Sequence, residues 1–336
     1  MKTLAPNKFT FLSVLIGLLL FCLFPLSAEA DFNWASATLD NDLFVGEDSG
    51  YTNGIFLSLY EAELEQGEMP EHDFWVAPLM WSMSQKDRIF AVNSYSIGQT
   101  MATPSDISIE NPAQDELPYS ALLALSNSYL TITPTYADLV STTIGIIGPA
   151  ALGEESQKFV HKVVGADDPK GWDTQLKNEP VFQLSRARTW RSWVSESGHS
   201  DILTSCELSL GTIRSAISGG AYLRYGRNLP ASYATVLFNS SRTSNPLGVD
   251  NGWYLYAGLE GGYIFNQIFT DGNTFRDSRS VDYKHEYVGA TAGLAYSWKN
   301  WSLTFAFTDA NILNRGDDKA LENLTQFGTL TLAWRL

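Results

Sequence analysis

The chain has 336 residues and carries 37 acidic against 22 basic side chains, a formal net charge of −15 at pH 7. This acidity argues against nucleic acid as a partner, because binding to phosphates requires clustered lysine and arginine. Only two cysteines occur, Cys22 and Cys206, and the first falls in the leader described next. A disulfide-stapled secreted fold is therefore excluded.

Residues 1–30 are predicted to be a secretory signal peptide. Two lysines precede an apolar run at 9–26, and a small-residue site follows that ends at Ala30. This order of positive, apolar and small residues predicts cleavage after Ala30 and argues against a transmembrane helix. The mature domain is then 31–336, with one cysteine and a net charge of −16.

Beyond the leader, the dominant pattern is alternation of apolar with small or polar residues, which predicts β-strands with one apolar face. In WSLTFAFT (301–308), tryptophan, leucine and two phenylalanines share one face. About twelve such runs occur, near 33–43, 52–62, 88–100, 119–132, 135–148, 178–194, 200–213, 216–227, 252–265, 283–298, 300–312 and 325–336.

These runs favour an all-β fold, an antiparallel transmembrane β-barrel of about twelve strands. Runs of about ten residues, aromatics near run ends and a final run at the chain end after a secretory leader all suit a barrel with lipid outside. An even strand count places both ends in the periplasm and the odd-numbered connections outside the cell. A soluble periplasmic β-sandwich would show the same alternation and remains the alternative.

Two connections stand out. Apolar residues at helical spacing in PAALGEESQKFVHKVVG (149–165) predict a short helix in the third outward connection. The segment 63–87 is long for a periplasmic connection, and the barrel pattern offers no reason for it.

A polar cluster in LDNDLFVGEDSGYTNGIF (39–56) is the candidate site. Strand parity places Asn41, Asp42 and Thr52 at the first outward connection, with Asp42 and Thr52 turned inward, and the predicted helix brings His161 to the same rim. Histidine can abstract a proton from water near neutral pH, and a carboxylate can hold a hard cation. Spacing alone favours ordinary turn chemistry and a surface histidine over a catalytic site.

The blocks NDLF…YTNG and IGIIGPAALGEESQKFVHKVVGADDPKGWDTQLKNEP resemble the outer-membrane lipid A 3′-O-deacylase family. The resemblance implies a twelve-stranded barrel in the outer membrane of a Gram-negative bacterium. It also implies calcium-dependent hydrolysis of the ester that holds the 3′ acyloxyacyl chain on lipid A. By motif, the catalytic residues are His161, Asn41, Asp42 and Thr52. Asp42 and Asp167 are the expected metal ligands, for Ca²⁺.

The chain departs from the family pattern at two positions. Asp167 stands where the family has a glutamate, which keeps the charge and shortens the side chain. A family lysine in the second outward loop has no counterpart in MATPSDISIENP, where Asp106 and Glu110 stand instead. Trp172 is a candidate for the acyl path, whereas Trp190 and Trp193 suit the membrane interface.

The expected partners are lipid A or lipopolysaccharide in the outer leaflet and the membrane itself, with a monomeric barrel. Two other functions remain as alternatives. One is an outer-membrane phospholipase or other esterase. The other is a non-enzymatic barrel, either a channel or an adhesin. Neither needs a different fold, so the site has to distinguish them.

Overall fold

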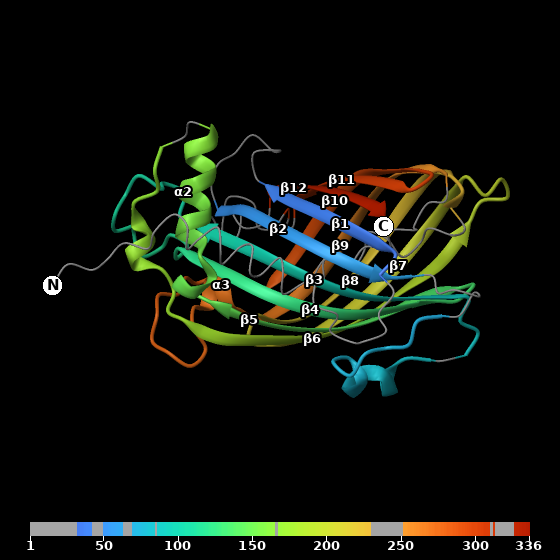
Figure 1. The fold of residues 1–336 in the computed structure, drawn as a ribbon, viewed down its shortest axis with the longest axis horizontal. Coiled ribbons are helices and arrows are strands. Elements are labelled where there is room, and N and C mark those ends of the chain that lie inside the picture. Colours follow the sequence, from blue (N-terminus) through green and yellow to red (C-terminus); the bar gives the residue numbers. More distant parts are fainter. Residues whose placement is uncertain are drawn as a thin grey trace.

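A computed structural model describes residues 32–41, 50–62, 69–84, 86–164, 167–229, 251–309, 312 and 326–336. The predicted signal peptide and Asp42 lie outside these ranges. The described residues form a closed antiparallel barrel in which each strand pairs with its neighbours along the chain and β1 pairs with β12 (Figure 1). The predicted barrel is thereby confirmed, and the sandwich is excluded.

Twelve strands make up the barrel, and every boundary lies within three residues of the predicted run. The strands are β1 (Trp34–Asn41), β2 (Gly50–Glu61), β3 (Phe90–Thr103), β4 (Ser120–Ile132), β5 (Tyr136–Ile147), β6 (Glu179–Val194), β7 (Ser200–Gly211), β8 (Arg214–Arg227), β9 (Trp253–Gln267), β10 (Glu286–Trp298), β11 (Trp301–Asp309) and β12 (Gln326–Arg335).

The helical elements lie in the connections. They are η3 (Ala77–Ser82), η4 (Pro149–Ala151), α2 (Gly153–Val164), η5 (Gly171–Thr174) and α3 (Ile268–Asp271). Within the described ranges, no helix has the length and hydropathy that a membrane crossing requires.

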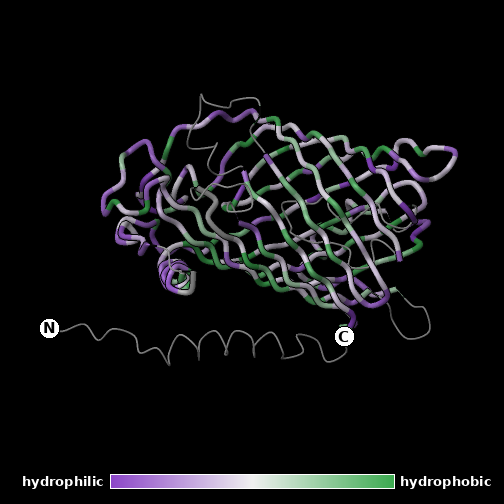
Figure 2. Tube along the Cα trace, turned by 90° about the horizontal axis from the view of Figure 1, so that it is seen from above, coloured by the Kyte–Doolittle hydropathy of each residue, from purple (hydrophilic) through white to green (hydrophobic). Residues whose placement is uncertain are grey.

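We call the end of the barrel that carries α2 and α3 the loop end, and the end where β1 begins and β12 finishes the turn end (Figure 1). Figure 2 shows hydrophilic residues gathered in the loops and helix beyond the loop end. Short turns such as 133–135 and 299–300 join strands at the turn end. Because outer-membrane barrels have short periplasmic turns and longer external loops, the turn end is the periplasmic one.

The outer face of the wall is mainly apolar, as lipid requires. Its exposed residues include Leu208, Leu223, Leu255, Leu259 and Phe307. Near the turn end these give way to exposed aromatic residues, which form an interfacial girdle. The girdle includes Trp190, Trp193, Tyr225, Tyr296, Trp298 and Trp301, and so both tryptophans predicted for the interface lie where expected.

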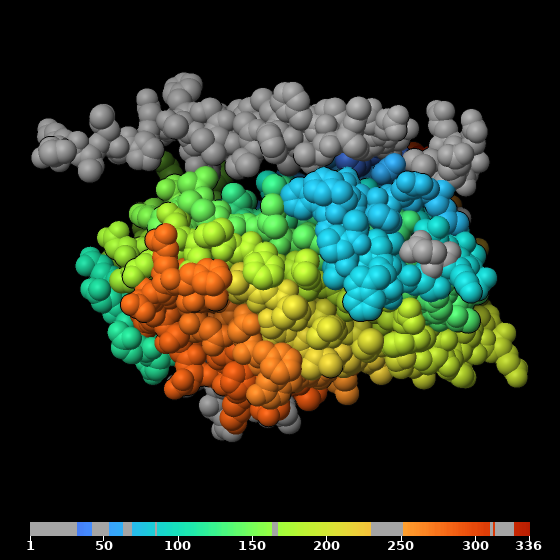
Figure 3. Space-filling model, turned by 90° about the horizontal axis from the view of Figure 1, so that it is seen from below, coloured from blue at the N-terminus to red at the C-terminus, as the bar shows by residue number. Residues whose placement is uncertain are grey.

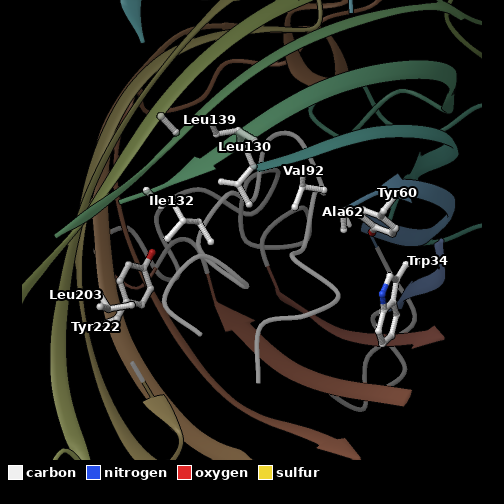
Figure 4. Packing of buried hydrophobic residues seen from close by; sticks show 11 residues of the cluster. Trp34, Tyr60, Ala62, Val92, Leu130, Ile132, Leu139, Leu203 and Tyr222 are labelled. Atoms are coloured by element: carbon white, nitrogen blue, oxygen red, sulfur yellow. The ribbon is translucent and has the colours of Figure 1, made fainter. Parts of the chain in front are cut away.

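Buried side chains point into the lumen at two levels. Near the turn end a buried cluster occupies the interior, and Figure 4 shows its side chains pointing inward from several strands. It includes Trp34, Tyr60, Leu130, Ile132, Leu203 and Tyr222. Near the loop end, α3 contributes Ile268 to a second buried cluster with Leu122 and Ile147.

Candidate active site

The predicted helix forms, but it starts later than the sequence pattern indicated. The chain turns sharply after β5 at Gly148, whose φ of 101° is unfavourable for residues with a side chain. Pro149 then opens the short η4, and α2 begins only at Gly153. Glu154 and Glu155 lie in the first turn of α2, where the positive end of the helix dipole favours acidic residues.

Helix α2 packs against the outer face of the barrel wall. Ala121 shares the outer face of β4 with the exposed Leu125, because side chains two and four residues apart lie on one side of a strand. A Cβ added to Gly153 would lie 2.4 Å from the Ala121 Cβ and 2.6 Å from the Trp172 Cη2. Only glycine therefore allows the helix to approach the wall this closely.

His161 is buried, with 6% of its surface exposed, in the last part of α2. Its Nδ1 lies 2.5 Å from the backbone oxygen of Asp167. A carbonyl oxygen can only accept a hydrogen bond, so Nδ1 carries the proton. In the neutral imidazole, Nε2 then holds the free electron pair that a general base needs.

Gln157 is a site residue that sequence reasoning passed over. It lies one turn before His161 on the same face of α2 and is 2% exposed. The Trp172 Nε1–H donates to its Oε1 over 2.7 Å, and its Nε2 is buried without a partner among the described residues. In the sequence, the spacing of four residues between Gln157 and His161 was the signal that both lie on one face of the helix.

Trp172 fixes this arrangement from η5. It is 1% exposed, and its ring lies 5.0 Å from that of Tyr119, centroid to centroid. Burial raises the pKa of the Tyr119 hydroxyl to about 12, so it remains a donor at physiological pH. Trp172 thus supports the helix from beneath. The described contacts do not test its predicted place in an acyl path.

The other predicted site residues lie at the loop end of β1 and β2. Asn41 ends β1, and it alternates with the inward Asp40, which accepts a hydrogen bond from the Thr329 hydroxyl. Asn41 therefore points to the outer side of the wall. Thr52 lies in β2, but the side chain is outside the described part of the structure, and Asp42 is outside it altogether.

A β-bulge interrupts the pairing of β2 beside Thr52. The register between β2 and β3 shifts between Gly50 and Asn53, so the alternation that assigned Thr52 an inward position is interrupted there. Asn53 is opposite Met101 of β3, and Met101 packs in one buried cluster with Trp172. The backbone register therefore brings this end of β2 next to the part of β3 that lies under α2.

Asp167 contributes its backbone to the site through His161, and its side chain is exposed. Within the described ranges, no three His, Cys, Asp or Glu side chains are grouped closely enough to hold a metal ion. The two predicted metal ligands are the carboxylates of Asp167 and Asp42. Carboxylate oxygens are the kind of ligand that calcium prefers.

The second outward loop has an acidic residue where a base was expected. Asp106 accepts hydrogen bonds from the backbone N–H and hydroxyl of Ser108, and these bonds lower the pKa of its carboxyl. The backbone N–H of Lys170 donates to Ile107 in the same loop over 2.9 Å. Lys170 is exposed, and so the third loop places a lysine beside the second.

A closed twelve-stranded barrel with an apolar outer face, and a buried histidine and glutamine on the outer side of its wall, define an outer-membrane protein with a candidate site outside its lumen. The family model described as "LpxR: Outer membrane protein LpxR" matches residues 14–336, and the chain belongs to this family. A search of curated protein sequences returned no match.

Among solved structures, LpxR from Salmonella typhimurium superposes with a TM-score of 0.69 at 15% identity, covering 90% of this chain and 100% of that one. The match supports the barrel fold. The β domain of the Bordetella autotransporter BrkA gives a TM-score of 0.44 at 11% identity, covering 91% and 99%. Outer membrane phospholipase A from Escherichia coli gives 0.30 at 11%, covering 90% of each chain.

Proposed function

We propose that the protein is a calcium-dependent lipid A deacylase that hydrolyses the 3′-O-linked acyloxyacyl ester in the outer leaflet of the outer membrane. One observation carries the proposal. His161, with Nδ1 bound to a backbone carbonyl, lies on the lipid side of the wall at the loop end. A base in that position meets a lipid that approaches sideways within the leaflet.

The chemistry requires one water and one base. His161 Nε2 takes a proton from water while the water oxygen attacks the ester carbonyl carbon. When the carbon–oxygen bond to the sugar breaks, the imidazolium returns this proton to the leaving alkoxide, so that a free fatty acid and a sugar hydroxyl remain. Asn41 and Thr52 orient the water or donate hydrogen bonds to the substrate.

Asp42 and Asp167 are the residues that would hold calcium, and the ion would supply positive charge beside the ester carbonyl. The backbone carbonyl of Asp167 orients His161, so one short segment of chain serves both the base and the proposed ligand. Gln157, held by Trp172, has an amide N–H available toward the same space.

The test is His161→Asn. An asparagine amide can still donate a hydrogen bond toward Asp167 but cannot act as a base, so deacylation should fall about 10²- to 10⁴-fold with the barrel intact. Mass spectrometry of lipid A from cells expressing each variant measures the product, and Lys162→Asn, on the exposed side of the same turn, is the control. Wild-type turnover by the His161 variant would refute the assignment.

The same preparations separate the lipid A reaction from phospholipid hydrolysis. Purified protein is offered lipid A and phosphatidylethanolamine vesicles in parallel, and released fatty acid is measured from each. Release that requires His161 but comes only from phospholipid would replace lipid A as the substrate while retaining the hydrolytic site.

A further inference from the structure

The connection between β2 and β3 folds back onto the outside of the barrel. We call residues 69–84 the strap. Figure 3 shows this segment, in cyan, lying flat over the wall in the half nearer the turn end. Val76 and Met83 of the strap form a buried cluster with outward-facing residues of β3, β4 and β5, namely Ala91, Tyr129 and Val140. This is the segment for which the sequence pattern offered no reason.

The wall beneath the strap is polar where a lipid-facing wall is normally apolar. Asp138 of β5 is fully buried and forms ion pairs with Arg186 and Arg188 of β6, each at 2.6 Å. On β4, the Asn127 amide donates to Asn93 of β3 over 2.9 Å. Facing bare hydrocarbon, these groups would be costly.

The polar wall supplies donors to the backbone of the strap. The Tyr129 hydroxyl donates to the carbonyl of Pro70 over 2.9 Å, and the Thr142 hydroxyl donates to Trp75 over 2.8 Å. Arg186 Nη2 donates to the carbonyl of Ser82 over 3.2 Å. Water would satisfy such carbonyls in the periplasm, whereas hydrocarbon cannot, so this matching suits a strap that lies within the bilayer.

From Phe74 onward, the outer surface of the strap is apolar and aromatic. Residues 74–84, FWVAPLMWSMS, contain no charged side chain, whereas charged residues stand on both sides at 71–73 and 86–88. Phe74 is 74% exposed and Trp81 is 86% exposed. Such a segment has the composition of a membrane-interface anchor.

Its height on the wall agrees with this composition. Trp190 of the girdle is opposite Tyr136 at the turn end of β5, and Thr142, which binds the strap, lies six residues further up that strand. At about 3.3 Å per residue and a tilt of about 40°, six residues span roughly 15 Å along the membrane normal. Trp75 is therefore well inside an apolar band of about 25 Å, and the Tyr95 hydroxyl of β3 donates a hydrogen bond to the carboxylate of the neighbouring Asp73.

We propose that the strap is inserted in the bilayer from the periplasmic side, with Phe74 and Trp81 in contact with phospholipid acyl chains. The strap replaces lipid over the polar sector of β3–β6 and gives the barrel an apolar anchor outside its own wall. The proposal depends on the barrel and its orientation, and it is independent of the hydrolytic function.

The test measures which quencher reaches the strap. In a background of Cys22→Ser and Cys206→Ser, single cysteines are introduced by F74C and W81C and labelled with bimane. L208C, on the exposed outer wall, is the lipid control, and K86C, in the charged flank, is the aqueous control. The labelled proteins are placed in nanodiscs, where aqueous solutes reach both faces.

Phosphatidylcholine with brominated acyl chains should quench F74C and W81C as strongly as L208C, and iodide should quench only K86C. Strong iodide quenching of the two strap positions would place them in water and overturn the proposal. Protection from both quenchers, together with cross-linking between copies, would make the strap a protein interface and would overturn it equally. Heat-modifiable gel migration verifies the fold of each variant.

Discussion

Gly153→Ala tests whether the close approach of α2 to the wall makes the site. The added methyl would lie 2.4 Å from the Ala121 Cβ and 2.6 Å from the Trp172 Cη2, whereas carbon atoms normally approach to about 3.5–4.0 Å. Both neighbours are packed into one buried cluster, so the helix has to move outward by about 1 Å. A displacement of about this size costs roughly 10²-fold in rate.

The barrel should survive this change, because α2 lies outside the wall and the strand ladder does not depend on it. The assay compares deacylation rates of purified variants, with heat-modifiable migration as the measure of folding. Glu155→Ala, exposed in the same turn, is the matched control and should keep its rate. Ala121→Gly removes the nearer contact and should restore part of the activity to Gly153→Ala. A full rate in Gly153→Ala would show that the position of α2 does not matter.

Three further outcomes are expected. Chelation of calcium should stop deacylation reversibly, and activity that persists in chelator would remove Asp42 and Asp167 from the metal role. Lys170→Ala should raise KM for phosphorylated lipid A several-fold with kcat unchanged. The control is Lys158→Ala, whose lysine is paired with Glu154 and which should alter neither KM nor kcat. Equal effects of the two substitutions would argue against a phosphate contact at Lys170. Asp138→Asn should lower the free energy of unfolding by about 3 kcal/mol, because it leaves two arginines without their buried partner; urea unfolding from vesicles measures this, and an unchanged midpoint would contradict it.

The sequence predicted the barrel well because alternation is a local property. The run at 119–132 became Ser120–Ile132, and the run at 178–194 became Glu179–Val194. The helix prediction was less accurate at its start. The apolar spacing indicates a face but not a boundary, and Gly148 and Pro149 force a turn before α2 can begin.

The side of the wall on which a loop folds is not a local property, and there the sequence reasoning was incomplete. Parity of β1 and β2 suggested an inward site, whereas α2, which carries His161, packs on the outer face of the wall. The side chains of Asp42 and Thr52 lie outside the described part of the structure, so their predicted orientation stays a prediction. Small residues at 121 and 153 were the available signal for an outside contact. For the strap, the signal was the charge at outward positions 138, 186 and 188.

The α2 loop and the strap both pack on the outer faces of β3 and β4, from opposite ends of the wall. On β4, Ala121 contacts the first and Tyr129 the second, a separation of eight residues or about 26 Å at about 3.3 Å per residue. Substitutions at sites this far apart affect the free energy of unfolding independently, because neither one breaks the strand hydrogen bonds between them. Asp138→Asn should therefore weaken the barrel while leaving the rate of the folded enzyme unchanged. The proposed role of the strap is therefore to hold the barrel at its position in the bilayer, whereas the proposed role of α2 is to position the catalytic histidine.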